Sequence, residues 1–416
     1  MLSVDLDPVR QEWLNRRNGR VYFWSYCLIF LAGPIMYLGV FQTTLCDWLG
    51  AGPTVANLPA AAYSLGLIAP LFVSWLVPHR HDRTTVVWCN GLMAVSLIAV
   101  AVFLVMPISP QWKIAMVVGQ GFGQGLLNSV SDMFTLQCLA RGTTVAGRAD
   151  ALRHTYTFSP ILAIVGSLGV QYIFHPGFPW LRKPFDFACV YLLAGVCIAG
   201  LTVISLLYRM PPLEDKPRTS LLGFFREGVR DFIQTRQLLL AFVVALLWTG
   251  GRLVSGNMAL FARTNLGAMP SDYSGTMLAI QFGGKAIGGF VLGWLAVRFG
   301  MRSPVIGVLA ALAAGAAWAW AVPGPLYLLC FAFIGATLLG GVYLPNYVLL
   351  HSDPRDGVRN ISILSLSSSA AFIAPAIHGA LAERFGFHSS FALTIGCATL
   401  GLLLAMRMEK SKGSHA

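Results

Sequence analysis

The chain has little charge for its length. Only 11% of its 416 residues are charged, and just 17 of them are acidic. In contrast, 56% of the residues are apolar and the mean hydropathy is +0.67. A water-soluble domain of this size does not combine so little charge with so much apolar surface. The composition therefore predicts an integral membrane protein.

The sequence also lacks the usual motifs of catalysis and metal binding. It has no CxxC pair, no histidine spacing suited to zinc, no HExxH and no G-x-S-x-G. The nearest approach to a phosphate-binding loop is Gly284-Lys285, but Ala279 stands at the first glycine position and Ala286 at the hydroxyl position. These absences disfavour an ATP-driven pump and predict no enzyme, cofactor or metal. A membrane-embedded enzyme remains the alternative from another class.

Basic residues outnumber acidic ones, with 29 Lys and Arg giving a net charge of +12. They do not gather into a basic domain or tail with interleaved aromatic residues, as nucleic-acid-binding regions do. They lie in short segments between apolar runs instead. We therefore expect no nucleic-acid partner, and we interpret the basic residues as markers of topology.

Runs of about 20 mostly apolar residues predict spanning helices. An all-α fold with twelve transmembrane helices in two six-helix bundles follows, with the spans at about residues 20–43, 55–77, 84–106, 112–139, 154–174, 186–208, 237–261, 272–298, 303–321, 325–350, 359–382 and 388–407.

A polar stretch at 210–236 divides the chain into a first half, residues 1–209, and a second half, residues 237–416. In this linker, apolar residues from Leu221 to Ile233 recur at helical spacing beside Arg226 and Arg230. The pattern predicts an amphipathic helix that either lies on the inner leaflet or packs on the protein's own cytoplasmic face.

The distribution of charge predicts the orientation. If the N-terminus is inside, 22 of the 29 Lys and Arg lie on the cytoplasmic side, five lie in outer loops and two lie within spans. Cytoplasmic loops retain positive charge during insertion. We therefore expect a multi-pass protein of the cell (inner) membrane, present as a monomer, with both termini in the cytoplasm.

The two halves echo each other after their second helices. Trp75 is followed eight residues later by Arg83, and Trp294 is followed eight residues later by Arg302. The second copy also contains two glycines and another arginine, at Gly293, Gly300 and Arg298.

This motif resembles the Gly-x-x-x-Asp-Arg-x-Gly-Arg-Arg pattern of the major facilitator superfamily, with Val297 at the acidic position. The resemblance implies a secondary transporter that works by alternating access, by symport or antiport. It also implies that the five residues Arg83, Gly293, Arg298, Gly300 and Arg302 act at the cytoplasmic gate. Ordinary positive-inside charge is the alternative explanation for the arginines.

A second motif lies in the predicted fourth helix. Gln120-Gly121-x-Gly123 resembles a pattern of the same family, but Val117 replaces its arginine. In the fifth helix Ser159-Pro160 stands where drug antiporters of the family have Gly-Pro. Both departures weigh against proton-coupled efflux of hydrophobic or drug-like compounds, which remains the alternative transport function.

Two cations inside predicted spans are the main candidates for substrate binding. At 1.5 Å per residue, Arg252 lies roughly 22 Å and Lys285 roughly 20 Å from the cytoplasmic ends of their helices. Trp248 and Gln281 each stand four residues before one of them, on the same helix face. We expect the two cations to bind an anionic group of a small organic solute. Neutralisation by carbonyls, or snorkelling to the surface, is the alternative.

Further polar residues complete the predicted binding site. Gln120, Gln124 and Asn128 form an i, i+4, i+8 stripe on the fourth helix. The resemblance implies that the first, fourth, seventh and tenth helices line the central cavity. It therefore adds Tyr37 from the first helix and Asn346 from the tenth.

Three residues are candidates for proton coupling, namely Asp132, His154 and His378. Asp132 is the only carboxylate well inside an apolar run. The alternative for Asp132 is an ion pair with Arg141 or Arg148 near the cytoplasmic mouth. Proton symport, antiport and uniport all remain open.

Overall fold

The structure is a computed structural model, and it describes residues 8–37, 39–77, 81–174, 181–211, 220–267, 269–352 and 357–409. These residues form helices and connecting segments, and no strand occurs among them. Residues 212–219 of the predicted linker lie outside the described residues.

The helices of the first half, in chain order, are α1 (Pro8–Leu31), α2 (Gly33–Met36), α3 (Phe41–Trp48), α4 (Pro53–Ala56), α5 (Leu58–Gly66), α6 (Ala69–Leu76), α7 (Asp82–Val105), α8 (Pro110–Gly142), α9 (Val145–Ile173) and α10 (Phe185–Ser205).

The helices that follow are α11 (Leu221–Gln234), α12 (Arg236–Arg252), α13 (Ser255–Leu266), α14 (Pro270–Phe299), α15 (Arg302–Ala321), α16 (Cys330–Thr337), α17 (Gly340–Leu350), α18 (Gly357–Ala370), α19 (Ala374–Phe385) and α20 (Phe387–Ala405), with 3₁₀ turns at Pro325–Leu329 and Ala371–Ile373.

Ten segments among the described residues are long and apolar enough to span a membrane. They match ten of the twelve predicted spans to within a few residues. The predicted spans 20–43 and 112–139 are not among them. The first is interrupted between α1 and α3, and the second, within α8, carries Gln120, Gln124, Asn128 and Asp132. The twelve-span layout therefore stays a prediction.

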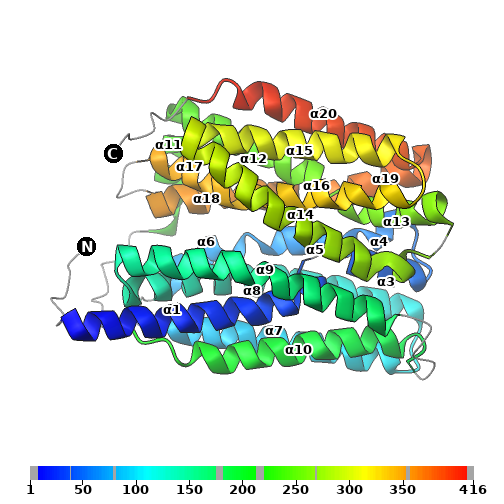
Figure 1. Ribbon diagram of the computed structural model, residues 1–416, viewed down its shortest axis with the longest axis horizontal. Coiled ribbons are helices and arrows are strands. Elements are labelled where there is room, and N and C mark those ends of the chain that lie inside the picture. Colours follow the sequence, from blue (N-terminus) through cyan, green and yellow to red (C-terminus); the bar gives the residue numbers. More distant parts are fainter. Residues whose placement is uncertain are drawn as a thin grey trace.

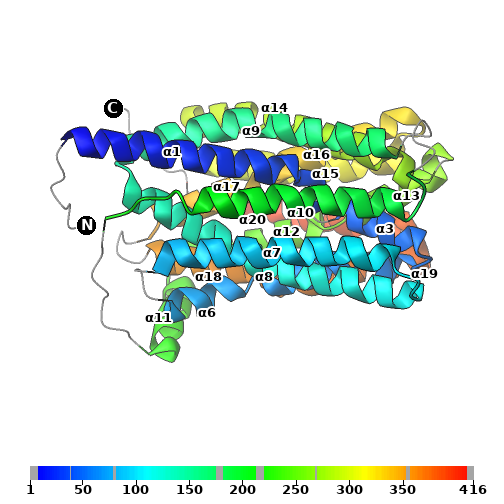
Figure 2. The same cartoon turned by 90° about the horizontal axis from the view of Figure 1, so that it is seen from below.

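The helices form a bundle with two layers. Figure 1 shows α1 and α7–α10 in the lower layer and α12, α15–α17 and α20 in the upper layer, with the long helices roughly parallel. Both chain ends lie at one end of the bundle, which we call the terminal end. Figure 2 shows α3, α13 and α19 at the other end, which we call the far end.

Several long helices are broken near the middle of the bundle. Pro34 cannot continue α1, and Gly39 has a φ of 134°, a conformation that favours glycine. In the second half α12 ends at Arg252 and α13 begins at Ser255. A Cβ added to Gly39 would lie 2.6 Å from the hydroxyl of Ser255, so the two breaks meet across the halves. Irregular backbone at membrane depth needs polar partners or a cavity.

Helix α11 lies at the terminal end (Figure 2) and packs against α12 and α18. Phe232 is buried, whereas Leu222 and Ile233 are among its exposed apolar residues. The predicted amphipathic segment is thus a helix that packs on the protein's own bundle and also leaves apolar side chains exposed.

Candidate functional site

Arg252 is the last residue of α12, directly at a helix break. Its guanidinium lies 4.9 Å from the centre of the Trp248 ring, a distance at which a cation and an aromatic face attract each other. The Trp248 indole N–H donates to the Thr337 carbonyl at 3.0 Å, where α16 ends. The buried Nε of Arg252 has no hydrogen-bond partner among the described residues. Arg252 is therefore held in position by Trp248 and retains a free donor.

Lys285 of α14 reaches across to the first half. Its ammonium donates to the Tyr37 hydroxyl at 3.0 Å and lies 4.8 Å and 4.9 Å from the ring centres of Tyr37 and Phe30. Lys285 and Arg252 are close enough to interact electrostatically. Neither forms an ion pair with any carboxylate of the described residues. The structure thus brings the two predicted cations together without neutralising them by direct pairing.

Asp132 faces the same region from α8. Its carboxylate accepts a hydrogen bond from Asn128 at 3.0 Å and interacts electrostatically with Lys285. The alternative that paired Asp132 with Arg141 is wrong, because the Arg141 guanidinium donates to Asp82 at 2.7 Å. The side chain of Arg148 lies outside the described residues. A carboxylate from the opposite half therefore lies within electrostatic range of Lys285.

The glutamines of α8 are buried and bonded to one another. The Gln120 amide donates to the Gln124 side-chain oxygen at 2.7 Å, and the Gln124 amide donates to the Met36 carbonyl at 2.9 Å. Gln42 donates to the Ile35 carbonyl at 2.7 Å. These amides satisfy carbonyls that the break after α2 leaves without helical partners. In this conformation Gln124 therefore supports the backbone of the site.

His378 supports the break after α12 in a similar way. Its ring bonds the Gly250 carbonyl at 3.0 Å and the Ser390 hydroxyl at 2.8 Å, so both ring nitrogens have partners. Thr394 donates to the Gly251 carbonyl at 3.2 Å. His154 of α9 is exposed, and its ring stacks near Phe158. His378 therefore lies next to the Arg252 segment, whereas His154 lies on α9 of the first half.

Two other predicted residues show different surroundings. Gln281 is buried on α14 one turn before Lys285, and its side-chain oxygen has no hydrogen-bond partner among the described residues. Asn346 donates to the Val342 carbonyl of its own helix at 2.8 Å. The Gln281 side-chain oxygen is therefore an unused acceptor one turn from Lys285, whereas the Asn346 amide bonds its own backbone.

Three predicted gate arginines lie toward the terminal end, and each contacts its own half. Arg83 donates to the Tyr208 carbonyl at 3.3 Å and Arg302 donates to the Met408 carbonyl at 3.0 Å. Arg298 is exposed and lies 5.4 Å from the ring centre of Trp294.

The two motif glycines differ in whether their position would tolerate a side chain. Gly300 has a φ of 82° and ends α14, which explains a glycine there. A Cβ added to Gly293 would make only an ordinary contact, 3.7 Å from the Tyr343 hydroxyl.

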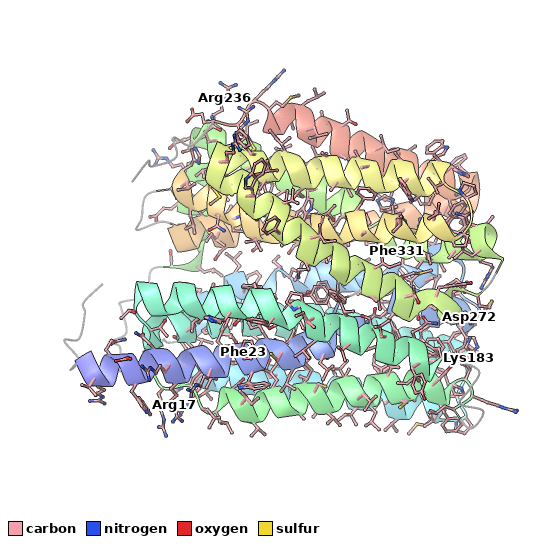
Figure 3. All side chains as sticks on the ribbon, in the orientation of Figure 1. Arg17, Phe23, Lys183, Arg236, Asp272 and Phe331 are labelled. Carbon is pink, nitrogen blue, oxygen red and sulfur yellow. The ribbon has the colours of Figure 1, made fainter. Side chains whose placement is uncertain are left out.

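The far end joins the two halves. Arg263 donates to Asp47 at 2.5 Å, Asn57 donates to Asn257 at 2.7 Å, and Lys183 donates to Ser271 at 2.8 Å. Figure 3 shows Lys183 and Asp272 at this end, opposite Arg17 and Arg236. Thr54 also donates to Glu383, and Gln171 donates to the Asp272 carbonyl.

The positions of these bonds along the bundle show where the two halves are joined. Among the described residues, polar bonds between the halves lie in the middle, at Tyr37 and Lys285, or at the far end. At the terminal end, Arg83 and Arg302 each bond a carbonyl of their own half. Beside the Asp47–Arg263 pair lies a cavity of about 380 Å³, which Pro53 and Phe387 also border. The conformation is therefore one in which the halves are joined at the far end.

Of the aromatic residues around Lys285, the sequence prediction included Tyr37 and missed the others. Phe30 and Phe282 are buried, and their ring centres lie 6.4 Å apart. Tyr26 lies one turn before Phe30, and Tyr156 of α9 lies 5.7 Å from Tyr26, centre to centre. The spacing of Tyr22, Tyr26 and Phe30 at i, i+4 and i+8 was the available signal.

Within the described ranges no three His, Cys, Asp or Glu side chains gather as they would around a metal ion. The chemistry that the site offers is thus a pair of partly buried cations, a carboxylate from the opposite half, amide oxygens without partners and aromatic faces. Such a set can bind and release a charged solute, and it contains no activated nucleophile.

Comparison with solved structures identifies the architecture. The chain is similar over 95% of its length to a variant of the nucleoside transporter NupG, with a TM-score of 0.64, 14% identity and 98% of that chain covered. It is similar over 94% of its length to the human organic anion transporter MFSD10, with a TM-score of 0.63, 16% identity and 99% of that chain covered.

The third comparison is the E. coli fucose:proton symporter FucP, at a TM-score of 0.59 and 14% identity, covering 95% of this chain and 100% of that one. The protein has the fold of major facilitator superfamily transporters. No protein-family model and no curated protein matches the sequence. This major facilitator fold and the apolar spans make the chain a multi-pass membrane protein, and the structures compared are transporters rather than enzymes.

Proposed function

We propose that this protein is a secondary active transporter of a small organic solute that carries an anionic group. The halves 1–209 and 237–416 exchange access to a central site, with the 210–236 linker between them. The chain crosses the membrane twelve times with both termini in the cytoplasm. Charge distribution supports this orientation, because 22 of the 29 basic residues then lie inside.

The observation that carries the proposal is the pair of cations, Arg252 and Lys285, without a directly paired carboxylate. A buried charge is costly unless it is compensated. Aromatic faces and the Tyr37 hydroxyl compensate these cations in part. The free Nε–H of Arg252 and the remaining ammonium hydrogens of Lys285 are then donors for a carboxylate or phosphate.

Alternating access also has support in the bonding pattern. A substrate bound between Lys285 and Arg252 would be closed off from the far end by the Asp47–Arg263 and Asn57–Asn257 contacts. Release of these contacts, with closure at the terminal end, would transfer the site to the other side. Arg83 and Arg302 hold helix ends within each half, which keeps each half rigid as it moves.

Asp132 is the candidate for proton coupling. Its negative charge acts on Lys285 from the other half, so it competes with an anionic substrate for the same cation. Protonation would remove that competition. A proton and an anion would therefore bind cooperatively, as a symporter of this kind requires.

The experiment uses purified protein in proteoliposomes. Organic anions are first screened by thermal shift, since a ligand that binds the folded state raises its apparent stability. Counterflow of a labelled hit then measures transport. Lys285→Ala and Arg252→Ala should each lower transport at least about tenfold, because each removes a hydrogen bond to a charged group.

Arg384→Ala, which removes an exposed cation far from the site, is the matched control and should transport normally. If both site variants moved every accepted solute as well as the wild type, the anion site would be wrong. Chemical change of the solute during counterflow would favour a membrane-embedded enzyme instead.

A further inference from the structure

Aromatic rings form a continuous ladder between the terminal end and Lys285. The ladder follows one face of α1, where the ring centres of Tyr22 and Tyr26 are 4.6 Å apart and those of Tyr26 and Phe30 are 6.4 Å apart. Across the helix break, the ring centre of Phe30 lies 6.0 Å from that of Tyr37, which in turn lies 5.0 Å from that of Phe282 on α14. The ladder therefore ends at the cation.

Part of this ladder is accessible. Tyr22, Phe30 and Phe282 are at most 1% exposed and serve as packing. Tyr26 and Tyr37 are only partly buried, and Tyr156 is 45% exposed. Tyr156 joins the ladder beside Tyr26, with ring centres 5.7 Å apart, and its hydroxyl lies 3.4 Å from that of Tyr22. Tyr26, Tyr37 and Tyr156 thus keep accessible ring surface along a ladder that ends at the cation.

The cation itself is bound to the ladder. Lys285 lies over the faces of Phe30 and Tyr37 and donates to the Tyr37 hydroxyl. Arg252 is likewise seated on an aromatic face, that of Trp248. A small hydrophilic dianion would need donors along its whole surface, whereas this site offers ring faces beside a few donors.

Aromatic rings prefer offset or edge-to-face contact with other rings. We infer that the transported anion is an aromatic carboxylate or a similar planar, unsaturated acid. Its ring packs against Tyr26 and Tyr156 while its acidic group reaches Lys285. The inference rests on the proposed function, because it names the substrate class of the same site.

The test is a binding measurement with three simple anions. Benzoate carries a planar ring, cyclohexanecarboxylate has the same charge and a similar size without aromatic character, and glucuronate is a hydrophilic acid. Benzoate should bind wild-type protein up to about tenfold more tightly than cyclohexanecarboxylate, the expected strength of an aromatic contact beyond simple burial. Glucuronate should bind more weakly than either.

The variants are Tyr156→Leu and Tyr26→Leu, which remove a ring and leave an apolar side chain. Each should bring the ratio of the affinities for benzoate and cyclohexanecarboxylate closer to one. Tyr156→Phe retains the ring and should preserve the wild-type ratio. Trp24→Leu is the matched control, because Trp24 is a 56% exposed aromatic residue of the same helix outside the ladder. It should leave the preference unchanged.

The outcomes separate this inference from the proposed function. If Lys285→Ala abolishes anion binding but wild type does not prefer benzoate, only the aromatic substrate class is wrong. The same conclusion follows if the preference survives both leucine variants. If no anion of the panel binds, or if Lys285→Ala and Arg252→Ala bind all three normally, the inference and the anion site both fail.

Discussion

The two halves of the protein are alike at the terminal end. In the first half, Asn18 accepts from the backbone N–H of Arg209 at 3.0 Å, and Arg83 donates to the neighbouring Tyr208 carbonyl. In the second half, Gln237 accepts from the N–H of Glu409 at 3.1 Å, and Arg302 donates to the neighbouring Met408 carbonyl. The same number of residues separates Asn18 from Gln237 and Arg83 from Arg302.

We call each such set an end clasp. In each half, an amide side chain from the first predicted spanning helix (α1 or α12) and an arginine from the third (α7 or α15) bond the backbone just after the last one (α10 or α20). The amides also hold the fourth helix of each half, through the Gly142 carbonyl in one case and the Tyr347 hydroxyl in the other. The two halves therefore make matching end bonds from equivalent positions, as the halves of an internally repeated framework would.

In the middle of the bundle the halves differ. The first half supplies Asp132 and most of the aromatic ladder, whereas the second half supplies both cations. An anion bound to Lys285 and Arg252 that also contacts Tyr26 would link the halves directly. The two halves therefore have similar ends and different central side chains, so that Asp132 acts on Lys285 across the interface between the halves and the proposed substrate would do the same.

The largest expected effect tests a difference between the clasps. The first half adds an ion pair in which Asp82 is fully buried, and Arg141 also donates to the Pro211 carbonyl at 2.9 Å. Asp82→Ala removes the buried carboxylate that the Arg141 guanidinium bonds and should cost about 3–5 kcal/mol of stability. The measurement is thermal unfolding in detergent.

The second half has the uncharged Tyr347 hydroxyl in its clasp, so Tyr347→Phe should cost only about 1 kcal/mol. Equal losses for Asp82→Ala and Tyr347→Phe would show that the two clasps are energetically the same.

The clasp amides should have matching effects. Asn18→Ala leaves the backbone N–H of Arg209 without its side-chain partner, and Gln237→Ala removes the acceptor that the Glu409 N–H shares with the Tyr347 hydroxyl. Each should cost about 1–3 kcal/mol. We expect similar decreases in melting temperature for the two variants. A loss confined to one of them would mean that the bonds look equivalent but only one half depends on them.

Much of the fold follows from hydropathy, because an apolar run of spanning length has few alternatives in a bilayer. The ends were less predictable where a helix continues past the membrane, as α1 does by starting at Pro8 instead of near residue 20. The breaks could not be predicted from their own residues alone. They depend on partners elsewhere in the chain, such as Gln124 for Met36 and His378 for Gly250.

The candidate site was likewise predicted only in part. Arg252 and Lys285 stand out in sequence because charges are rare inside spans. Their neighbours do not, since Tyr37 lies 248 residues from Lys285 along the chain. Asp132 was assigned an alternative partner close in sequence, Arg141, but that arginine bonds Asp82. The sequence located the charged residues, and the three-dimensional structure was needed to identify the residues that each of them contacts.

Asp132→Asn tests the charge that crosses between the halves. In wild type, binding of an organic anion should strengthen as the pH falls, because protonation of Asp132 frees Lys285 from a competing negative charge. The coupling should be roughly fivefold or more in affinity. In Asp132→Asn the charge is absent, so binding should be tight and nearly independent of pH. A pH dependence that persists in this variant would assign proton coupling to another group.

The smallest expected effect concerns the far end, where Asp47 and Arg263 join the halves. The Arg263 side chain is 50% exposed, so the pair contributes about 1 kcal/mol or less. Arg263→Asp should nonetheless replace attraction by repulsion and favour separation of the halves there. Hydrogen exchange in 41–48 and 255–266 should then increase a few-fold. The double variant Asp47→Arg, Arg263→Asp restores an ion pair with the charges reversed, so it should restore protection from hydrogen exchange. The control variant Arg384→Asp should leave hydrogen exchange unchanged. If the double variant exchanged as fast as the single one, the far-end contact would depend on the shape of these residues rather than on their charge.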